Sequence, residues 1–391
     1  MGRKVELPKV AAKTEMEILC RSRIDRLRLR FSGLGTDSYL VTHLPNIRYL
    51  CGFTGSAGIL LVESSRSSLF TDSRYTFQSH EEVRDSDIFI AKHGLIRAVG
   101  TVLRKHPKRS RVAYSPTHVS VTQKSAFQNG AGPRVRWVDG GDTIEKLRAV
   151  KDAGELATMN EVARLNSDVF RGVLGAIKPG ISELNLAAEI EYSMKRKGAT
   201  GPSFDTIVAS GPRSAWAHAR PSPKPLRKNE LVVLDHGAIL RGYCSDMTRT
   251  VFLGRPPAKV RRLYAAVLEA QEAAKAAIRP GIMAGKVDAV ARGALRRKGL
   301  ARYFTHSTGH GLGIEIHELP RLGRGDETIL EQGMVVTIEP GIYLEGFGGI
   351  RIEDEVVVTA RGAVELTTTL PVSLVALTKV SPLTATPLPL I

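Results

Sequence analysis

Ala176-Ile-Lys-Pro-Gly-Ile181 recurs 101 residues later as Ala277-Ile-Arg-Pro-Gly-Ile282. The similarity continues without a gap to Gly198 in the first copy and Gly299 in the second, and nine of the 23 aligned positions are identical. In each copy a helix-compatible stretch precedes the Pro-Gly turn and another follows it, before β-branched and apolar runs begin. The repeat therefore predicts a domain built from a duplicated half, each half made of two helices and a set of strands.

The 391 residues exceed what one ordinary core holds and suit two domains. Before the repeat, an Arg-rich amphipathic helix pattern from Thr14 to Phe31 is followed by short apolar runs typical of strands. A second helical pattern, from Asp142 to Met159, joins this region to the repeat. We expect an α/β amino-terminal domain over residues 1–150, an α+β domain over residues 151–380 and a flexible, Pro-rich tail over residues 381–391.

The net charge of +17 raises the question of nucleic-acid binding. The basic residues are dispersed, however, and no zinc finger, RNA-binding strand signature or basic heptad array accompanies them. A solvated basic surface is the better interpretation, and nucleic acid is not an expected partner. Retention on DNA with a steep salt dependence would support the alternative.

The three cysteines, Cys20, Cys51 and Cys244, lack the spacing of a disulfide framework or a thiolate metal site, so we expect reduced thiols. No apolar run is long enough to cross a bilayer, and the charged start of the chain lacks the apolar core of a signal peptide. We therefore expect a cytoplasmic protein with no membrane partner.

Two pairs of acidic residues are placed where predicted hairpins would bring them together. A hairpin centred between residues 240 and 241 would set Asp235 directly opposite Asp246, with Cβ atoms about 5 Å apart. A second hairpin, centred near Gly346, would face Glu339 to Glu353. Carboxylates that close repel each other unless a proton or a cation lies between them. The two pairs, one from each repeat, thus predict a metal site in preference to solvated strand ends.

Four histidines fall in the same domain and add imidazole to these oxygen ligands. His306, His310 and His317 lie in one segment whose glycines at 309, 311 and 313 argue against a helix, and His218 precedes the first acid pair. Carboxylates alone suit Mn²⁺, Mg²⁺ or Ca²⁺, whereas added imidazole favours Mn²⁺, Fe²⁺, Co²⁺ or Zn²⁺.

The motifs that contain these residues resemble those of the pita-bread metallopeptidases, which include aminopeptidase P, prolidase and, more distantly, methionine aminopeptidase and creatinase. Two segments near the start, Phe53-Thr-Gly-Ser-Ala-Gly and Thr71-Asp-Ser-Arg-Tyr, resemble the amino-terminal domain of the proline-specific branch. The catalytic motifs are Asp235-His-Gly-Ala, Ser245-Asp-Met-Thr-Arg-Thr, His306-Ser-Thr-Gly-His-Gly-Leu-Gly, His317-Glu-Leu-Pro, Thr337-Ile-Glu-Pro-Gly-Ile-Tyr and Gly349-Ile-Arg-Ile-Glu-Asp.

The resemblance implies a pita-bread catalytic domain, two divalent metal ions, with Mn²⁺ expected before Co²⁺ or Zn²⁺, and a homodimer. The implied metal ligands are Asp235 on one ion, His310 with Glu339 on the other, and Asp246 with Glu353 bridging both. The implied roles of the remaining residues are substrate contact and stabilisation of the tetrahedral intermediate for His218 and His317, proton transfer for Glu339, orientation of the ligand carboxylates for Arg351, and substrate binding for Tyr343.

The expected activity is that of an Xaa-Pro aminopeptidase acting on proline-containing peptides. An Xaa-Pro dipeptidase shares all five ligands and is the alternative, and a creatinase-like hydrolase or a non-catalytic binding module is a more distant one. The sequence departs from the family pattern before His218, where Arg213 and Ala217 replace a common Asn and Pro. This departure affects the expected shape of the substrate pocket and leaves the ligands intact.

Overall fold

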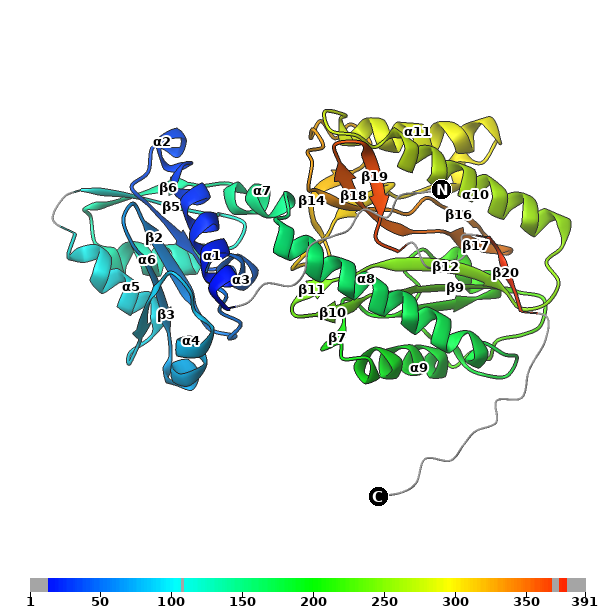
Figure 1. Cartoon of the computed structure of the whole chain (residues 1–391), viewed down its shortest axis with the longest axis horizontal. Helices are drawn as coiled ribbons and strands as arrows, with labels where there is room; N and C mark the ends of the chain where they lie inside the picture. The colour runs from blue at the N-terminus through cyan, green and yellow to red at the C-terminus, as the bar shows by residue number, and fades with distance from the viewer. Residues whose placement is uncertain (1–12, 107–108, 368–372, 378–391) are drawn as a thin grey trace, which may run out of the picture. The chain divides into compact units, whose positions relative to one another are not determined.

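The computed structural model describes residues 13–106, 109–367 and 373–377, and the chain divides into two compact units between Arg148 and Ala149 (Figure 1). The tail predicted over residues 381–391 lies outside the described residues.

The amino-terminal unit is built on a six-stranded mixed sheet with the strand order β4-β3-β2-β1-β5-β6. The pairs β1–β2 and β2–β3 are antiparallel, and β3–β4, β1–β5 and β5–β6 are parallel. The strands are β1 (Ser38–Val41), β2 (Ile59–Glu63), β3 (Ser67–Thr71), β4 (Asp87–Ile90), β5 (Ser110–Tyr114) and β6 (Val135–Asp139). The helices are α1 (Lys13–Arg28), α2 (Phe31–Leu34), α3 (Leu44–Cys51), α4 (Thr76–Glu82), α5 (Leu95–Arg104), α6 (Val121–Ala131) and α7 (Thr143–Ala149), with the 3₁₀ turn η1 (Ser73–Tyr75).

Helices cover both faces of this sheet, which is why its central strands are apolar throughout. Leu40 and Leu61 pack with Phe127 in a core formed with α5 and α6. Leu60 points to the opposite face and is equally buried, because α1 and α3 pack against β2 there. The α/β architecture predicted for this region is confirmed.

The second unit contains two larger sheets, with the orders β20-β12-β9-β8 and β14-β13-β15-β18-β19, and two small ones, β11-β10-β7 and β16-β17. Its helices are α8 (Ala153–Val173), α9 (Glu183–Arg196), α10 (Ala258–Ala277) and α11 (Ala284–Arg297), with 3₁₀ turns η2 (Leu174–Ala176), η3 (Gly211–Ala215) and η4 (Ala301–Tyr303). Its strands are β7 (Gly201–Pro202), β8 (Ile207–Ser210), β9 (Leu231–His236), β10 (Ala238–Leu240), β11 (Tyr243–Cys244), β12 (Met247–Phe252), β13 (Gly309–Gly311), β14 (Glu318–Leu322), β15 (Val335–Ile338), β16 (Gly341–Leu344), β17 (Gly348–Arg351), β18 (Asp354–Thr359), β19 (Gly362–Glu365) and β20 (Val375–Ala376).

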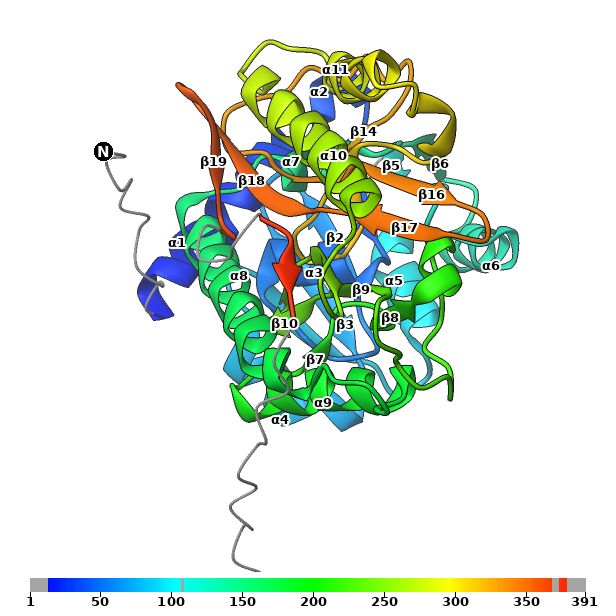
Figure 2. The same ribbon diagram turned by 90° about the vertical axis from the view of Figure 1, so that its right-hand side faces the viewer.

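The duplication predicted from the repeat is visible in this unit. Helices α8 and α9 precede the antiparallel strands β8-β9-β12, and helices α10 and α11 precede β13-β15-β18 in the same order. Figure 2 shows the two helix pairs on different sides of the unit, α10 and α11 at the top and α8 and α9 lower down. The bounds of α9 and α11 are offset by 101 residues at both ends. The residue before each of these helices forms an equivalent isolated bridge, Ser182 with Pro225 and Met283 with Ile329.

The single helix predicted from Asp142 to Met159 is wrong, because two helices with a break at residues 150–152 take its place. The Asp152 side chain accepts a hydrogen bond from the Glu155 N–H, and the Glu155 side chain accepts one from the Asp152 N–H. This capping box starts a new helix within a helical pattern. At the break, Val150 pairs with Met334 instead of continuing α7.

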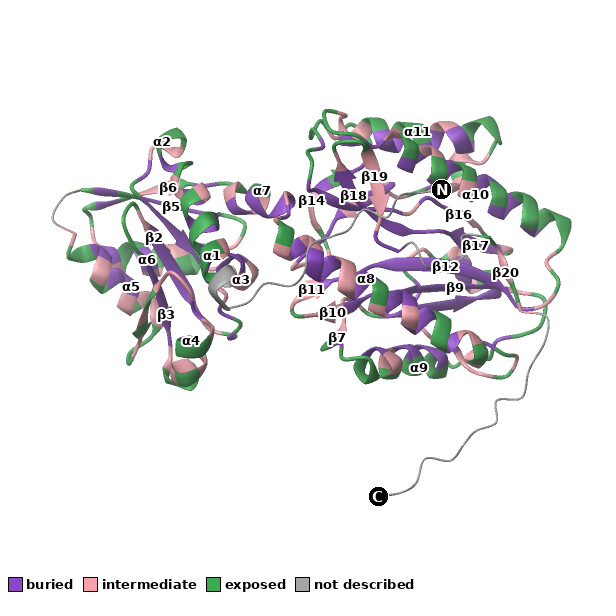
Figure 3. Cartoon of the chain, viewed as in Figure 1, coloured by how far each residue is buried: buried purple, intermediate pink, exposed green. Residues whose placement is uncertain are grey.

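The strands that precede the predicted ligands run through the interior of the second unit. Every residue of β9, β12 and β15 is buried, whereas the long helices bury one side and expose the other (Figure 3). None of the helices within the described ranges combines the length and the apolarity that crossing a membrane requires.

Candidate active site

Eight of the nine residues predicted for the site line one cavity of about 310 Å³ in the second unit. The walls also include the apolar side chains of Phe204, Ile207 and Ile316 and the exposed pair Asp205 and Arg220. Tyr343 is the one predicted residue outside this lining. The eight are His218, Asp235, Asp246, His310, His317, Glu339, Arg351 and Glu353.

The first acid pair is brought into the cavity by a hairpin whose register differs from the prediction. Asp235 at the end of β9 lies opposite Thr248, so Asp246 is not its direct cross-strand partner. The turn is formed by Arg241 and Gly242, both with positive φ, which moves its centre by one residue. Gly237 and Asp246 lie between the β10–β11 ladder and the β9–β12 ladder, which share the same centre. The Asp246 side chain reaches the cavity from this short break between the ladders.

The second acid pair follows the predicted register. In β16 and β17, Gly341 pairs with Arg351, and beyond this ladder Ile338 pairs with Asp354. Both pairings centre the hairpin on Gly346, so Glu339 and Glu353 lie at opposite positions in the short break between the two ladders. The facing arrangement predicted for these two acids is confirmed.

His310 lies on β13 with its Nε2 atom directed at the acids. This nitrogen is 3.4 Å from Asp246 Oδ2 and 3.7 Å from Glu339 Oε1. The other ring nitrogen, Nδ1, is 3.0 Å from the Gly311 carbonyl oxygen and donates to it, which leaves the lone pair on Nε2. Gly309 permits this placement because a Cβ at that position would lie 1.8 Å from the Thr337 carbonyl oxygen.

The chemistry of these donors fits divalent cations. Asp246, His310 and Glu353 each offer one ligand atom, and the three atoms lie within 4.8 Å of one another. Among the described residues, Asp235 Oδ1, Asp246 Oδ1 and Glu353 Oε1 are buried without a hydrogen-bond donor. Burial, followed by the charge of Asp235, raises the pKa of Asp246 well above its usual range. Burial and then Asp246 have the same effect on the pKa of Glu353. Cations would satisfy these oxygens and relieve this repulsion.

Arg351 fixes the orientation of Asp235 and Glu353, two of the predicted metal ligands. Its NH2 group donates to Asp235 Oδ2, and its Nε donates to Thr248 Oγ1 at 2.9 Å. Thr248 Oγ1 in turn donates to Glu353 Oε2 at 2.6 Å. One guanidinium therefore orients a predicted metal ligand from each half of the domain, Asp235 directly and Glu353 through Thr248.

Tyr343 supports Arg351, which differs from the substrate contact expected for it. Its hydroxyl oxygen accepts from Arg351 NH1 at 2.8 Å and lies 2.8 Å from His306 Nε2. Burial raises the pKa of Tyr343 to about 12 and lowers that of His306 to about 4, so the tyrosine stays protonated and the imidazole neutral at pH 7. We place Tyr343 as a positioning residue, because its hydroxyl is engaged on both sides by protein groups.

A buried ionic cluster lies beneath the second acid pair. Arg249 donates to Asp354 Oδ1 at 2.5 Å and to the Glu353 carbonyl oxygen at 2.5 Å. Asp354 also accepts from Gln271 at 2.9 Å and pairs with Lys275 at 3.3 Å. Burial alone would raise the pKa of Asp354, but the charges of Arg249 and Lys275 lower it overall. The backbone at Glu353 is thus fixed by a charge network that never reaches the cavity.

Glu355 gives the metal-free protein a pH-dependent stability. Burial raises the pKa of Glu355 from 4.5 to about 8, although the Asp246 N–H donates to its carboxylate. Between these two values the folded chain binds more protons than the unfolded chain, so the free energy of unfolding falls as pH rises through this window. We expect chelated protein to unfold at less urea near the top of the window than near its bottom, and Glu355→Gln to flatten that slope. An identical slope in the variant would contradict this account.

The segment that departs from the family pattern is ordered by contacts of its own. Arg213 Nε donates to the buried carboxylate of Glu183 at 3.0 Å, and its NH2 donates to the Arg220 carbonyl oxygen at 2.6 Å. The Ala217 carbonyl oxygen accepts from Arg351 NH1 at 2.9 Å. The Arg213 side chain therefore fixes the backbone after His218, whereas the contact at Ala217 comes from its backbone and does not depend on the replacement.

Three residues that our sequence-based site did not include take part in this arrangement: His306, Thr248 and Arg220. His306 lies in a motif that the sequence singled out, but its partner Tyr343 is 37 residues away. Thr248 could have been found as the third residue of the Asp246-Met-Thr motif. Arg220 follows His218 by two residues and carries no signal beyond its charge.

Comparisons with known proteins agree with this geometry. Residues 157–360 match the model of metallopeptidase family M24, and residues 23–150 match the creatinase/prolidase N-terminal domain. An Xaa-Pro dipeptidase of Pyrococcus horikoshii is 36% identical over 341 residues, which span 85% of this chain and 93% of that protein.

Solved structures give the same result over nearly the whole chain. An Xaa-Pro dipeptidase from Bacillus anthracis matches with a TM-score of 0.88 at 37% identity, covering 91% of this chain and 99% of that one. An X-Pro aminopeptidase from Thermotoga maritima matches with a TM-score of 0.83 at 36% identity, covering 90% and 99%. Most of the named relatives are Xaa-Pro dipeptidases or prolidases.

The family match accounts for both parts of the molecule. Members of this family bind divalent metals in a dinuclear site, which agrees with the acid and imidazole groups that line the cavity. All three cysteines are buried in the described part of the chain, and none of them forms a disulfide. With its pita-bread catalytic domain and its creatinase/prolidase N-terminal domain, the chain belongs to metallopeptidase family M24 and is a metallo-exopeptidase.

Proposed function

We propose that this metallo-exopeptidase is an Xaa-Pro dipeptidase, which hydrolyses the bond between a first residue and a C-terminal proline. The motifs alone led us to expect an Xaa-Pro aminopeptidase. The names of most relatives favour the dipeptidase, and so does the cavity. Its 310 Å³ lie at the lower end of the roughly 300–1,000 Å³ that small-molecule pockets span, which suits a dipeptide better than a longer chain.

The cavity wall suits proline. The side chains of Phe204, Ile207 and Ile316 form its apolar part, where a pyrrolidine ring can pack. Proline has no backbone N–H, so its imide bond needs no hydrogen-bond acceptor from the enzyme.

The polar residues have separate tasks in hydrolysis. Two divalent cations, when bound, would polarise the scissile carbonyl and acidify a water molecule. Glu339, whose pKa burial raises, takes at its carboxylate the proton that the attacking water releases, and it returns this proton to the proline nitrogen as the scissile C–N bond breaks. Burial, followed by the neighbouring imidazoles of His310 and His218, lowers the pKa of His317, so its ring is neutral and donates an N–H to the oxygen of the tetrahedral intermediate.

Arg220 is the cation that recognises the substrate carboxylate in this proposal. Its side chain is 87% exposed at the cavity, and its nearest acid, Asp205, is 86% exposed and 3.8 Å away. Exposed pairs of this kind contribute only about 0–1 kcal/mol, so a dipeptide carboxylate can displace Asp205 from Arg220.

The test compares three substrates that share the same Xaa-Pro unit: Ala-Pro, its C-terminal amide and the tripeptide Ala-Pro-Ala. We expect kcat/KM to be highest for Ala-Pro. An ion pair from an exposed arginine contributes about 1 kcal/mol or less, so Arg220→Gln should raise KM for Ala-Pro by up to about 5-fold and leave the amide unaffected. Arg255→Gln, an exposed arginine outside the cavity lining, is the matched control.

The opposite order of substrates would overturn the proposal. If the wild-type enzyme cleaved Ala-Pro-Ala faster than Ala-Pro across Mn²⁺, Co²⁺ and Zn²⁺, the aminopeptidase assignment would be the correct one. The identity of the metal as Mn²⁺ and the homodimer stay predictions from the family resemblance.

A further inference from the structure

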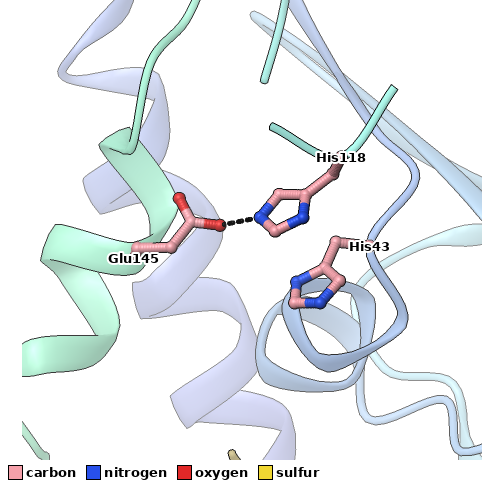
Figure 4. Close-up of side chains that lie close together, drawn as sticks. All are labelled: His43, His118 and Glu145. Carbon is pink, nitrogen blue, oxygen red and sulfur yellow. Dashed lines mark hydrogen bonds and ion pairs between the residues drawn. The ribbon is translucent and has the colours of Figure 1, made fainter. Parts of the chain in front are cut away.

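A second cluster of metal-binding side chains lies in the amino-terminal unit. His43 precedes α3, His118 lies in the loop after β5, and Glu145 is on α7 (Figure 4). Each offers one ligand atom, and the three atoms lie within 4.8 Å of one another. The His118 Nε2 atom is 2.8 Å from Glu145 Oε1. Three segments separated by up to about a hundred residues thus converge on one point.

The carboxylate of this cluster is held by partners of its own. Asn46 Nδ2 donates to Glu145 Oε1 at 2.6 Å, and Arg148 NH1 donates to Asn46 Oδ1 at 2.7 Å. Such outer partners fix the orientation of ligands in metal sites. The second oxygen, Glu145 Oε2, is buried and has no hydrogen-bond donor within the described part of the chain. Its lone pairs remain available to a cation.

The two imidazoles are packed against each other next to this carboxylate. Their ring centroids are 3.8 Å apart and their planes differ by 3° (Figure 4). The Thr42 hydroxyl donates to the His118 carbonyl oxygen at 3.1 Å, which ties the His118 loop to the residue before His43. Both rings are thereby confined to the same small volume.

The side chains are also accessible to an ion. About a fifth of the His118 and Glu145 side chains is exposed, at 21% and 19%. Ligand atoms around a tetrahedral Zn²⁺ lie about 3.4 Å apart, given metal–ligand distances of about 2.1 Å. The widest separation in the cluster, at most 4.8 Å, therefore has to shorten, and the 2.8 Å between His118 Nε2 and Glu145 Oε1 has to lengthen. The lone pairs of the two stacked rings lie in two parallel planes, so His43 has to rotate out of the stack for both nitrogens to face one ion.

We propose that His43, His118 and Glu145 form a metal site in the amino-terminal unit that binds a first-row divalent cation such as Zn²⁺. This site is separate from the catalytic cage, by which we mean the predicted ligands Asp235, Asp246, His310, Glu339 and Glu353. Two imidazoles and one carboxylate match the preference of Zn²⁺ and its neighbours in the first transition row. The ion replaces the proton between His118 and Glu145 and leaves a fourth position open to water. It joins α7 to the loop after β5 and to the start of α3.

The test is the zinc content of the untagged full-length chain after dialysis against micromolar Zn²⁺. We expect His118→Asn and Glu145→Gln each to bind one ion per chain less than the wild type. His80→Asn, which changes an exposed histidine on α4, should bind as many ions as the wild type. Asp246→Asn alters the catalytic cage and leaves the proposed site unchanged. The double variant Asp246→Asn/Glu145→Gln should therefore bind one ion per chain less than Asp246→Asn alone. Equal zinc content in the wild type and in both site variants would overturn the proposal.

Crystals soaked in Zn²⁺ give a second test that does not depend on the folding of any variant. We expect an anomalous difference peak between His118 Nε2 and Glu145, with the His43 ring rotated out of the stack. Crystals with peaks at the catalytic cage and none at these three residues would disprove the site.

Discussion

Asp246→Asn is expected to abolish hydrolysis and, in the same protein, to stabilise the metal-free fold. Asp246 is 5% exposed, and burial together with Asp235 and Glu339 raises its pKa. Asparagine keeps the shape of the side chain and removes its negative charge. In the metal-loaded protein this charge helps to bind the cations, whereas in the metal-free protein it is repelled by the neighbouring carboxylates. We expect kcat/KM to fall by more than the roughly 100-fold that loss of an outer partner of a metal ligand costs.

The stability effect is measured by urea unfolding near pH 8, with and without chelator. After chelation the midpoint should be higher for Asp246→Asn than for the wild type, whereas added Mn²⁺ should stabilise the wild type more than the variant. Asp168→Asn removes an exposed carboxylate on α8 and should change neither quantity. Turnover close to that of the wild type in Asp246→Asn would refute the assigned cage.

Arg249→Met is expected to be the most destabilising single change outside the cage. The Arg249 side chain is 2% exposed and pairs with Asp354, whose own side chain is 1% exposed. Removing Arg249 takes away the nearer cation of Asp354, which keeps Lys275 at 3.3 Å. We therefore expect a cost of up to about 3–5 kcal/mol of unfolding free energy, the amount that breaking a buried pair causes. The measurement is urea unfolding of the metal-loaded protein, so that changes in the empty cage do not contribute.

A double variant and a surface control make this prediction specific. Arg249→Met combined with Asp354→Leu removes both charges and should recover much of the loss, because Lys275 keeps Glu365 and Glu272 as partners. Arg241→Met removes one member of a half-exposed pair with Glu161 and should cost about 1 kcal/mol or less. Equal costs for the two single arginine variants would show that burial of the Arg249 pair has no consequence.

The structure could be predicted from the sequence alone where residues close together in the chain determine the geometry. The repeat predicted the duplicated half because its Pro-Gly turns and helices recur at a fixed offset. The hairpin centred on Gly346 was also predictable, since one glycine-rich turn connects two regular strands there. In both cases the residues that specify the geometry are close together in the chain.

The errors arose where tertiary contacts choose between local alternatives. The turn at Arg241 places a bulky residue at positive φ, which no turn preference would select, and the hairpin register shifted with it. The helix break at Asp152 competes with a continuous helical pattern, and the bridge of Val150 to Met334 decides between them. The role of Tyr343 depends on Arg351 and His306, which come from other strands and loops.

The matching strand orders of the two halves have a consequence for how the cage discriminates between ions. Asp235 lies opposite Ile207, and the Glu339 N–H donates to the Thr308 carbonyl oxygen, so Ile207 and Thr308 are equivalent positions. Two residues after each of these positions come Ala209 on β8 and His310 on β13, so Ala209 is the counterpart of His310 in the first half. The pseudo-twofold symmetry of the acids is therefore broken by a single imidazole. One end of the predicted cage offers only oxygen and the other offers nitrogen as well, so we expect the two ions to bind with different affinities and the nitrogen-containing end to prefer Mn²⁺, Fe²⁺, Co²⁺ or Zn²⁺.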